Sequence, residues 1–276
     1  MRVKLLIGQI LPYITITLFT LGILYRLGRW AGARIVHNIT LSPWLQNNGQ
    51  VAVRIGSEAF LFRNLFRFDL ALWAGAILMH FALLNILGGH IVGFGFLGEQ
   101  FALIPGLGIS PELSKEMSNM LGTIFGIVLF LTLLYLLIRR LTLTKVKQVT
   151  KPSDNLWLIY LLVLVGVGDV MRLFEASFGV EYQLVRDYIV ALALFKPVDG
   201  MELLNNGFFL VHFLLVQILL IVFPFSKLMH LFGMFTERWI VNRVYKDPAP
   251  GLPNIDVAAA RAAGLGVPSD AAEEGV

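Results

Sequence analysis

Four histidines offer the clearest chemistry in this sequence. His80 and His90 are ten residues apart in one long apolar run, and His212 and His230 are eighteen apart in or beside another. An imidazole is costly inside hydrocarbon, so intramembrane histidines usually face a bundle interior and carry a function. Imidazole is a common axial ligand of haem iron, and two pairs could hold two haems. The fifth histidine, His37, lies in a polar segment and is most simply a solvated residue.

Long apolar runs must position these histidines. The chain has 276 residues, of which 57% are apolar and 14% charged, whereas soluble domains carry about 25% charged residues. This composition excludes an ordinary soluble enzyme and a disordered chain. The runs are long rather than short and alternating, which favours helices over a barrel. We therefore expect an all-α integral membrane protein, a bundle of five transmembrane helices at residues 5–25, 70–96, 120–138, 156–170 with some extension, and 207–225 continuing toward 231.

The basic residues predict the orientation of these helices. Sixteen of the 22 lysines and arginines lie in the segments that would share one side of the membrane. Cytoplasmic loops are enriched in basic residues, so we expect the N-terminus outside and the C-terminus in the cytoplasm. This confinement explains the net charge of +4 better than nucleic-acid binding does, and we expect no nucleic-acid partner.

The topology sorts the histidines by depth. The second and fifth helices would be antiparallel, so His90 and His212 form an outer pair and His80 and His230 an inner pair, which predicts two haems b. His90 would lie roughly 15 Å farther out than His80, and about 80° around the helix, so tilt must absorb the mismatch. His212 and His230 would share one face of a continuous helix. Glycines around His90 would let a flat ligand approach, although histidines that only link helices by hydrogen bonds are the structural alternative.

Other segments give weaker signals. Residues 37–66 form a polar loop that could hold a surface helix, and residues 181–195 predict an amphipathic helix on the outer surface. We expect a membrane domain at residues 1–246 and a cytoplasmic tail at 247–276, disordered or bound to a partner. Asp169 is a candidate proton-handling carboxylate, but a salt bridge to Arg172 or snorkelling to the interface is the favoured interpretation. Because the chain has no cysteine, any iron–sulfur cluster must belong to a partner.

Several motifs together resemble one known family. They are LPYITITLFTLGILYRLGRW, the H-x9-H of the second helix, the IRRL loop, and H-x17-H ending in FPFSKLMH. This set is similar to the gamma subunit of respiratory nitrate reductases. It is equally similar to the membrane cytochromes b of the sulfite-reduction-associated Dsr complex and of membrane-bound heterodisulfide reductase. The resemblance extends over residues 5–245.

The resemblance implies a five-helix, dihaem cytochrome b that exchanges electrons with menaquinol or a related quinol near the outer haem. It implies His90 and His212 as ligands of the outer haem, and His80 and His230 as ligands of the inner one. It places the quinol near Gly89, Gly93 and Lys115. The implied partner is a cytoplasmic iron–sulfur subunit, heterodisulfide-reductase-like or nitrate-reductase-beta-like, and further membrane or outer subunits could join.

The branch of the family sets the expected role. The LFGMF that follows SKLMH favours the Dsr or heterodisulfide branch, with electron exchange in dissimilatory sulfur metabolism. The alternative is a nitrate reductase gamma subunit, in which quinol oxidation feeds nitrate reduction. A non-haem anchor or transporter is a more distant alternative, because no inverted repeat is visible and the four histidines divide between two helices. The direction of electron flow stays open.

Overall fold

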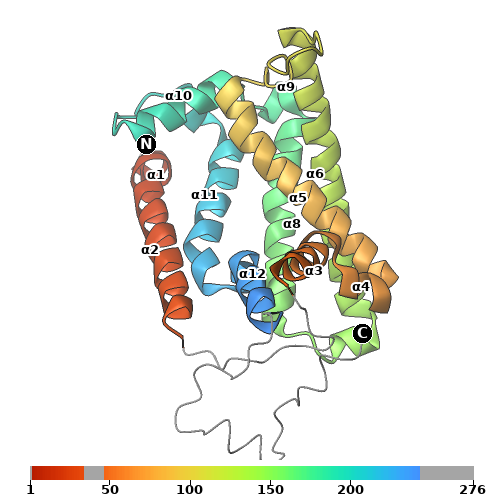
Figure 1. The fold of residues 1–276 in the computed structure, drawn as a ribbon. Helices are drawn as coiled ribbons and strands as arrows, with labels where there is room; N and C mark the ends of the chain where they lie inside the picture. Colours follow the sequence, from red (N-terminus) through yellow and green to blue (C-terminus); the bar gives the residue numbers. More distant parts are fainter. Residues whose placement is uncertain (1, 34–46, 243–276) are drawn as a thin grey trace, which may run out of the picture. The chain divides into compact units, whose positions relative to one another are not determined.

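A computed structural model describes residues 2–33 and 47–242, and every regular element in them is a helix (Figure 1). Five helices are long and apolar enough to cross a membrane, which confirms the expected fold class. They are Arg2–Ala31, α5 (Leu70–Phe96), α6 (Pro111–Thr142), α8 (Pro152–Leu173) and Gly207–Phe225. The first comprises α1 (Arg2–Leu5), the π-helical η1 (Leu6–Ile10) and α2 (Leu11–Ala31). The last comprises α11 (Gly207–Val222) and η3 (Phe223–Phe225). The orientation of the termini in the membrane stays a prediction.

Short helices complete the described residues. They are α3 (Asn48–Leu61), α4 (Arg63–Phe68), α7 (Thr144–Lys147), α9 (Glu175–Phe178), α10 (Tyr182–Ala193), η2 (Glu202–Asn205), η4 (Lys227–Met229) and α12 (His230–Val241). The expected surface helix of the polar loop is α3, and the expected amphipathic helix is α10. The predicted tail and His37 lie outside the described residues.

Side-chain caps fix where α5, α6 and α11 begin. The Asp69 carboxylate accepts a hydrogen bond from the Leu72 N–H at 2.8 Å and starts α5. The Ser110 hydroxyl accepts from the Leu113 N–H at 3.2 Å, and the Asn206 side chain caps α11 through the Phe209 N–H at 3.0 Å. Each cap satisfies a backbone donor that the first turn of a helix leaves unpaired. The caps therefore set the register of the histidines on α5 and α11.

The chain forms two compact units, and the first comprises Met1–Ile23 and Asn64–Ser226. In this unit α5 packs on α6, α6 on α8, and α8 on α11, while α10 lies across one end (Figure 1). We call this the α10 end; there α5 and α8 finish and α6 and α11 begin. A hydrophobic core at this end includes Tyr188 of α10. Burial raises the pKa of the Tyr188 phenol, whose hydroxyl donates to the Gly8 carbonyl at 2.5 Å.

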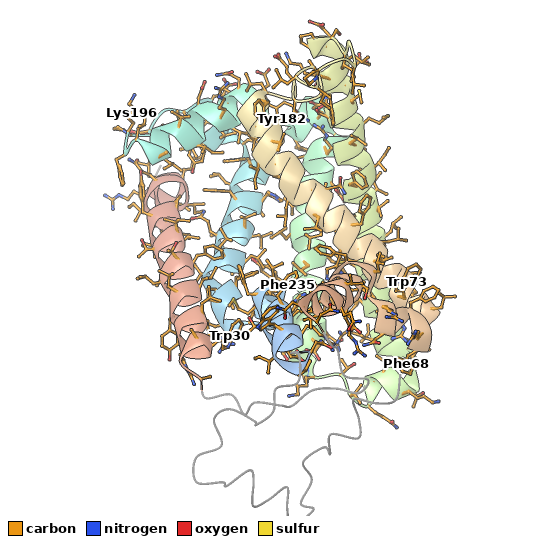
Figure 2. All side chains as sticks on the ribbon, in the orientation of Figure 1. Trp30, Phe68, Trp73, Tyr182, Lys196 and Phe235 are labelled. Atoms are coloured by element: carbon orange, nitrogen blue, oxygen red, sulfur yellow. The ribbon has the colours of Figure 1, made fainter. Side chains whose placement is uncertain are left out.

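The second unit comprises Leu24–Arg63 and Lys227–Val276. Within its described residues α3 packs against α12. Arg238 pairs with Glu58 at 3.8 Å, and the rings of Phe60 and Phe235 lie 6.4 Å apart. Trp30, labelled with Phe235 in Figure 2, packs against Gly233, where an added Cβ would lie 3.3 Å from the indole.

The fifth membrane helix is shorter than expected. Instead of continuing toward residue 231, α11 ends at Val222 and is followed by the 3₁₀ turn η3. Pro224 has no N–H to donate, and Ser226 is extended with φ −105° and ψ 175°, so the helical ladder breaks. A new helix, α12, begins at His230. The expectation that His212 and His230 share a face of one continuous helix is therefore wrong.

The third membrane helix is longer than expected. It begins at Pro111, not at residue 120, because the Ser110 cap and a proline at its first position start the helix within a polar stretch. An apolar-run criterion misses this amphipathic first section. As a result Lys115, which the sequence places shortly before the helix, lies inside it.

Candidate functional site

The structure brings together the two histidines of the predicted outer pair. His90 of α5 and His212 of α11 have ring centroids 6.3 Å apart, with 16° between the ring planes. His90 is exposed and His212 is half-buried. Both lie toward the α10 end of the first unit, and the sequence prediction for this pair rested on depth alone.

Each of these histidines uses its Nδ1 on a backbone carbonyl. The His90 Nδ1 lies 2.7 Å from the Ile86 carbonyl, and the His212 Nδ1 lies 3.1 Å from the Leu164 carbonyl of α8. A carbonyl oxygen only accepts hydrogen bonds, so the proton must be on Nδ1 and the Nε2 lone pair is left to bind a metal. Metal-binding histidines typically hold their second nitrogen in this way.

The spacing of the pair fits a haem iron between the rings. With a metal–nitrogen bond of about 2.0 Å and a ring centroid about 1.2 Å beyond the nitrogen, two opposed imidazoles have centroids about 6.4 Å apart. Haem needs two axial side chains, because the porphyrin supplies the other ligands. The described ranges 2–33 and 47–242 hold no group of three or more metal-binding side chains. The residues present therefore fit a bis-histidine haem.

Glycines and an aromatic ring surround the pair. A Cβ added to Gly89 or Gly93 would meet no heavy atom within 4 Å, so the approach to this face of α5 is open. On α8 the opposite holds, because a Cβ at Gly168 would lie 3.1 Å from the His212 Cε1. Phe94 contacts His90 edge to face, with centroids 5.6 Å apart. A flat ligand can approach the histidines from the α5 side.

Sequence reasoning missed the contribution of α8. Leu164 orients the His212 ring through its carbonyl, and Gly168 leaves space for that ring. The signal was the GVG triplet at residues 166–168 in the fourth apolar run, since small residues mark close helix contacts in membranes.

The inner histidines show the same local hydrogen bonding. The His80 Nδ1 lies 2.8 Å from the Ala76 carbonyl, and the His230 Nδ1 lies 3.0 Å from the Lys227 carbonyl. His80 belongs to the first unit and His230 to the second. The inner pair therefore stays a prediction.

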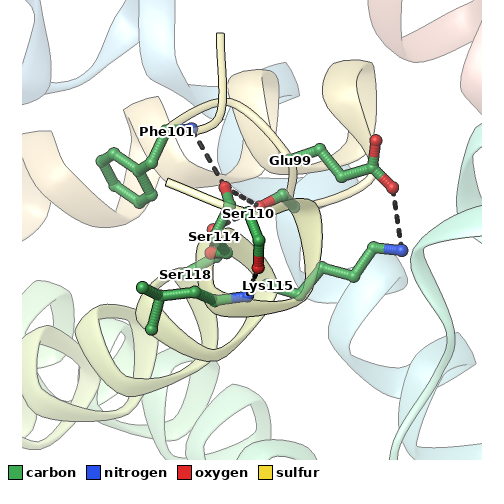
Figure 3. Close-up of polar contacts among 8 residues, drawn as sticks. Glu99, Phe101, Ser110, Ser114, Lys115 and Ser118 are labelled. Carbon is green, nitrogen blue, oxygen red and sulfur yellow. Dashed lines mark hydrogen bonds and ion pairs between the residues drawn. The ribbon is translucent and has the colours of Figure 1, made fainter. Parts of the chain in front are cut away.

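Lys115 lies beside the loop that follows α5. Its Nζ pairs with the Glu99 carboxylate at 2.8 Å, and both side chains are partly exposed (Figure 3). The buried Ser114 hydroxyl donates to the Gly98 carbonyl at 2.8 Å and accepts from the Phe101 N–H at 3.0 Å. This clamp holds the loop on α6, so Lys115 is fixed near the end of the helix that carries Gly89 and Gly93. Their joint role in binding a quinol stays a prediction.

Asp169 does not form the expected salt bridge. Arg172 instead donates to the Asn119 side-chain oxygen at 2.6 Å and to the Tyr182 hydroxyl at 3.2 Å. Among the residues that the structure describes, Asp169 makes no hydrogen bond or ion pair, and it lies in close contact with the position that a Gly126 Cβ would take.

Comparisons with known proteins find one matching family and several relatives. Residues 64–245 match the family described as nitrate reductase gamma subunit. The Hdr-like menaquinol oxidoreductase cytochrome b-like subunit of Archaeoglobus fulgidus is 29% identical, over 84% of this chain and 78% of that protein. The nitrate reductase gamma chain of Bacillus subtilis is 27% identical, over 86% of this chain and 98% of that protein. The respiratory nitrate reductase 2 gamma chain of Escherichia coli is 26% identical, over 85% of this chain and 94% of that protein.

Proposed function

Because the chain belongs to the nitrate reductase gamma subunit family, we propose that it is the membrane cytochrome b subunit of a menaquinol oxidoreductase. The observation that carries this proposal is the paired His90 and His212, each with Nδ1 on a carbonyl and Nε2 left for iron. The five long apolar helices support a multi-pass membrane protein, and we place it in the inner membrane.

His90 and His212 would hold one haem b, and His80 and His230 a second. When bound, haem b supplies a one-electron carrier that links a two-electron quinol to a distant acceptor. The chain's own residues orient the ligands, since the Ile86 and Leu164 carbonyls fix the tautomer of the outer pair. The same hydrogen bond at His80 and His230 supports their assignment as ligands.

A menaquinol or related quinol would bind on the open face of α5. Gly89 and Gly93 leave room for a flat ring, because no heavy atom comes within 4 Å of a Cβ at either position. Lys115, paired with Glu99, would offer an ammonium donor to a quinone oxygen from the neighbouring helix. The α10 end would face outside, so protons released there would enter the compartment on the opposite side of the membrane from the cytoplasm.

The electron partner would be a cytoplasmic iron–sulfur subunit. A chain without cysteine has no thiolate for a cluster. The last turn of α6 and the segment from there to α8 carry five basic residues, suited to an acidic docking surface, and the tail at 247–276 would bind the same partner.

We favour the Hdr-like branch and a role in dissimilatory sulfur metabolism, as in the Dsr-type complex. The LFGMF that follows SKLMH supports this branch, as does the similarity to the Archaeoglobus subunit. Nitrate reduction is the second candidate, and the match to 98% of the Bacillus subtilis chain supports it.

Purification of the intact complex tests the function. We expect a b-type α-band that develops on addition of menaquinol or its soluble analogue and declines on addition of the matching quinone, together with a copurifying iron–sulfur subunit. A heterodisulfide-reductase-like partner supports the sulfur branch, and a molybdenum-enzyme partner supports nitrate reduction. A complex that carries no haem contradicts the proposal.

A further inference from the structure

An unpaired carboxylate lies inside the first unit. Asp169 is half-buried in α8, four residues before this helix ends, and faces the glycine side of α6 at Gly126. It makes no hydrogen bond or ion pair with any part of the chain that the structure describes. A lone carboxylate at this depth is unfavourable unless it has a role, so it is a candidate for function.

Asp169 lies next to the residues that contact His212. The preceding residue, Gly168, faces the imidazole, and the Leu164 carbonyl accepts its Nδ1–H. Two turns of α8 therefore carry both the support of the histidine site and the free carboxylate.

Polar side chains continue from Asp169 toward the α10 end. Arg172, one turn farther along α8, donates to the Asn119 oxygen of α6 at 2.6 Å. The Tyr182 hydroxyl of α10 donates to the same oxygen at 2.9 Å. Figure 2 labels Tyr182 beside the end of α5, where its ring meets Phe94 edge to face at 5.9 Å. The three polar groups thus join α6, α8 and α10 at one point.

The far end of this polar series reaches exposed groups. A Cβ on Gly98 would lie 3.0 Å from the Tyr182 ring and 3.2 Å from the Lys115 side chain. The side chains of Lys115 and Glu99, which form an ion pair, are 49% and 40% exposed. Tyr182 therefore lies between the Asn119 contact and an exposed ion pair (Figure 3 shows the Lys115 end).

One face of α6 lines this whole series. Lys115, Asn119, Gly122 and Gly126 recur at helical spacing of four, three and four residues. The eleven residues from Lys115 to Gly126 rise roughly 16 Å along the helix. Asn119 contacts Arg172 and Tyr182, and Gly126 contacts Asp169. A small-and-polar stripe on α6 therefore leads from the carboxylate to the end of the bundle.

The charged and titratable groups around Asp169 are few. Arg172 lies on its own helix, His212 comes from α11, and Tyr182 comes from α10. The α6 residue that faces it, Gly126, is uncharged.

We propose that Asp169 accepts the protons that a quinol releases at the histidine site and passes them toward the α10 end through water held beside Asn119 and Tyr182. This inference rests on the proposed function. Oxidation of each quinol would remove two electrons, for which a haem b held by the histidines would be the one-electron acceptor, and two protons as its two O–H bonds break. The carboxylate forms an O–H bond with the first proton, loses it to water, and then accepts the second. Quinone reduction would use the same steps in reverse.

The test compares Asp169→Asn with wild type in the purified complex. Asn keeps the shape of the side chain but cannot take a proton. We expect unchanged haem content and an unchanged dithionite-reduced spectrum, with quinol-driven haem reduction slowed about 100-fold, as for loss of a general base. Wild-type reduction should accelerate as pH rises and the carboxylate ionises, and the variant should lose this pH dependence. A carboxyl C=O band should also disappear from the redox-induced infrared difference spectrum.

Matched variants keep the outcome decisive. Asp187→Asn, an exposed carboxylate on α10, should behave as wild type. Asp169→Glu should recover part of the rate, and Tyr182→Phe should slow reduction less than Asp169→Asn while the Phe94 contact stays. If Asp169→Asn loses haem, the Tyr182→Phe variant tests the path instead. Wild-type reduction kinetics in Tyr182→Phe would then overturn the proposal. Wild-type rate and pH dependence in Asp169→Asn overturn the proposal, whereas failure of wild-type haem to respond to quinol overturns the proposed function instead.

Discussion

Gly75 and Gly93 lie on the same helix and both are buried, yet their surroundings differ. A Cβ at Gly75 would lie 2.5 Å from the Tyr135 ring of α6, whose hydroxyl donates to the Ala71 carbonyl at 3.1 Å. A Cβ at Gly93 would meet no heavy atom within 4 Å. The first glycine allows two helices to pack closely, and the second leaves one face of α5 accessible.

The difference divides α5 into two functional sections. Near its start, α5 is packed against α6, and farther along Ala82 is buried with Leu129 and Leu133. Beyond residue 88, a Cβ added to any of its glycines would meet no heavy atom within 4 Å. Close packing fixes the helix, so the open section can present an imidazole at a set distance from α11. Identical residue types thus allow close packing in one section and leave free space beside the helix in the other.

Removal of His90 or His212 should give the largest effect. Either substitution by Ala should remove one of two haems, lowering the haem-to-protein ratio to about half, because each iron needs both axial ligands. The ratio is measured by the pyridine haemochrome spectrum. Asn85→Ala, on the same helix between His80 and His90, should keep the full ratio. Full haem content in His90→Ala would show that the open section of α5 holds no haem.

Replacement of each of the two glycines by Ala tests whether α5 has one packed and one open section. Gly75→Ala should destabilise the protein by about 1 to 3 kcal/mol, since the methyl group overpacks the α5–α6 contact. Gly93→Ala should keep the melting temperature, because the methyl group meets nothing, but should raise the KM for quinol. Thermal melting and quinol titration separate the two effects. Equal loss of stability in both variants would remove the distinction between packed and open sections.

A methyl group on α8 should disturb His212. In Gly168→Ala the Cβ would lie 3.1 Å from the ring, so the imidazole must tilt and the midpoint potential of one haem should shift by tens of millivolts. Gly166→Ala is the matched control, since its Cβ faces Phe130 at 3.3 Å. Redox potentiometry gives the result. A shift of equal size in both variants would mean that α8 acts through general packing.

Lys115→Ala should give the smallest effect. An exposed ion pair contributes little to stability, so the melting temperature should not change. The KM for quinol should rise several-fold if Lys115 donates to the ring oxygen, as steady-state kinetics will show. Lys196→Ala, another exposed lysine toward the α10 end, is the control. Identical kinetics in the two variants would exclude Lys115 from the quinol site.

Much of this fold and site could be predicted from the sequence. Long apolar runs identified the five membrane helices, because burial in hydrocarbon demands length and hydrophobicity. Counting depth along antiparallel helices paired His90 with His212 before any contact was known.

Local breaks and long-range contacts were not predictable in this way. The run FPF is apolar and looks like a continuing helix, yet Pro224 and the extended Ser226 end the ladder there. Arg172 lies three residues after Asp169, a spacing typical of ion pairs. Asn119 and Tyr182, distant in sequence, offer Arg172 two acceptors instead. The role of Gly168 likewise depends on a ring from another helix.

The central claim is that paired histidines of this chain hold haem b. The reduced-minus-oxidised optical spectrum of the purified protein, titrated with potential and normalised to protein, tests it directly. We predict a b-type α-band that titrates in two steps, one for each haem. A spectrum without a b-type band, from protein purified intact in detergent, would contradict the claim.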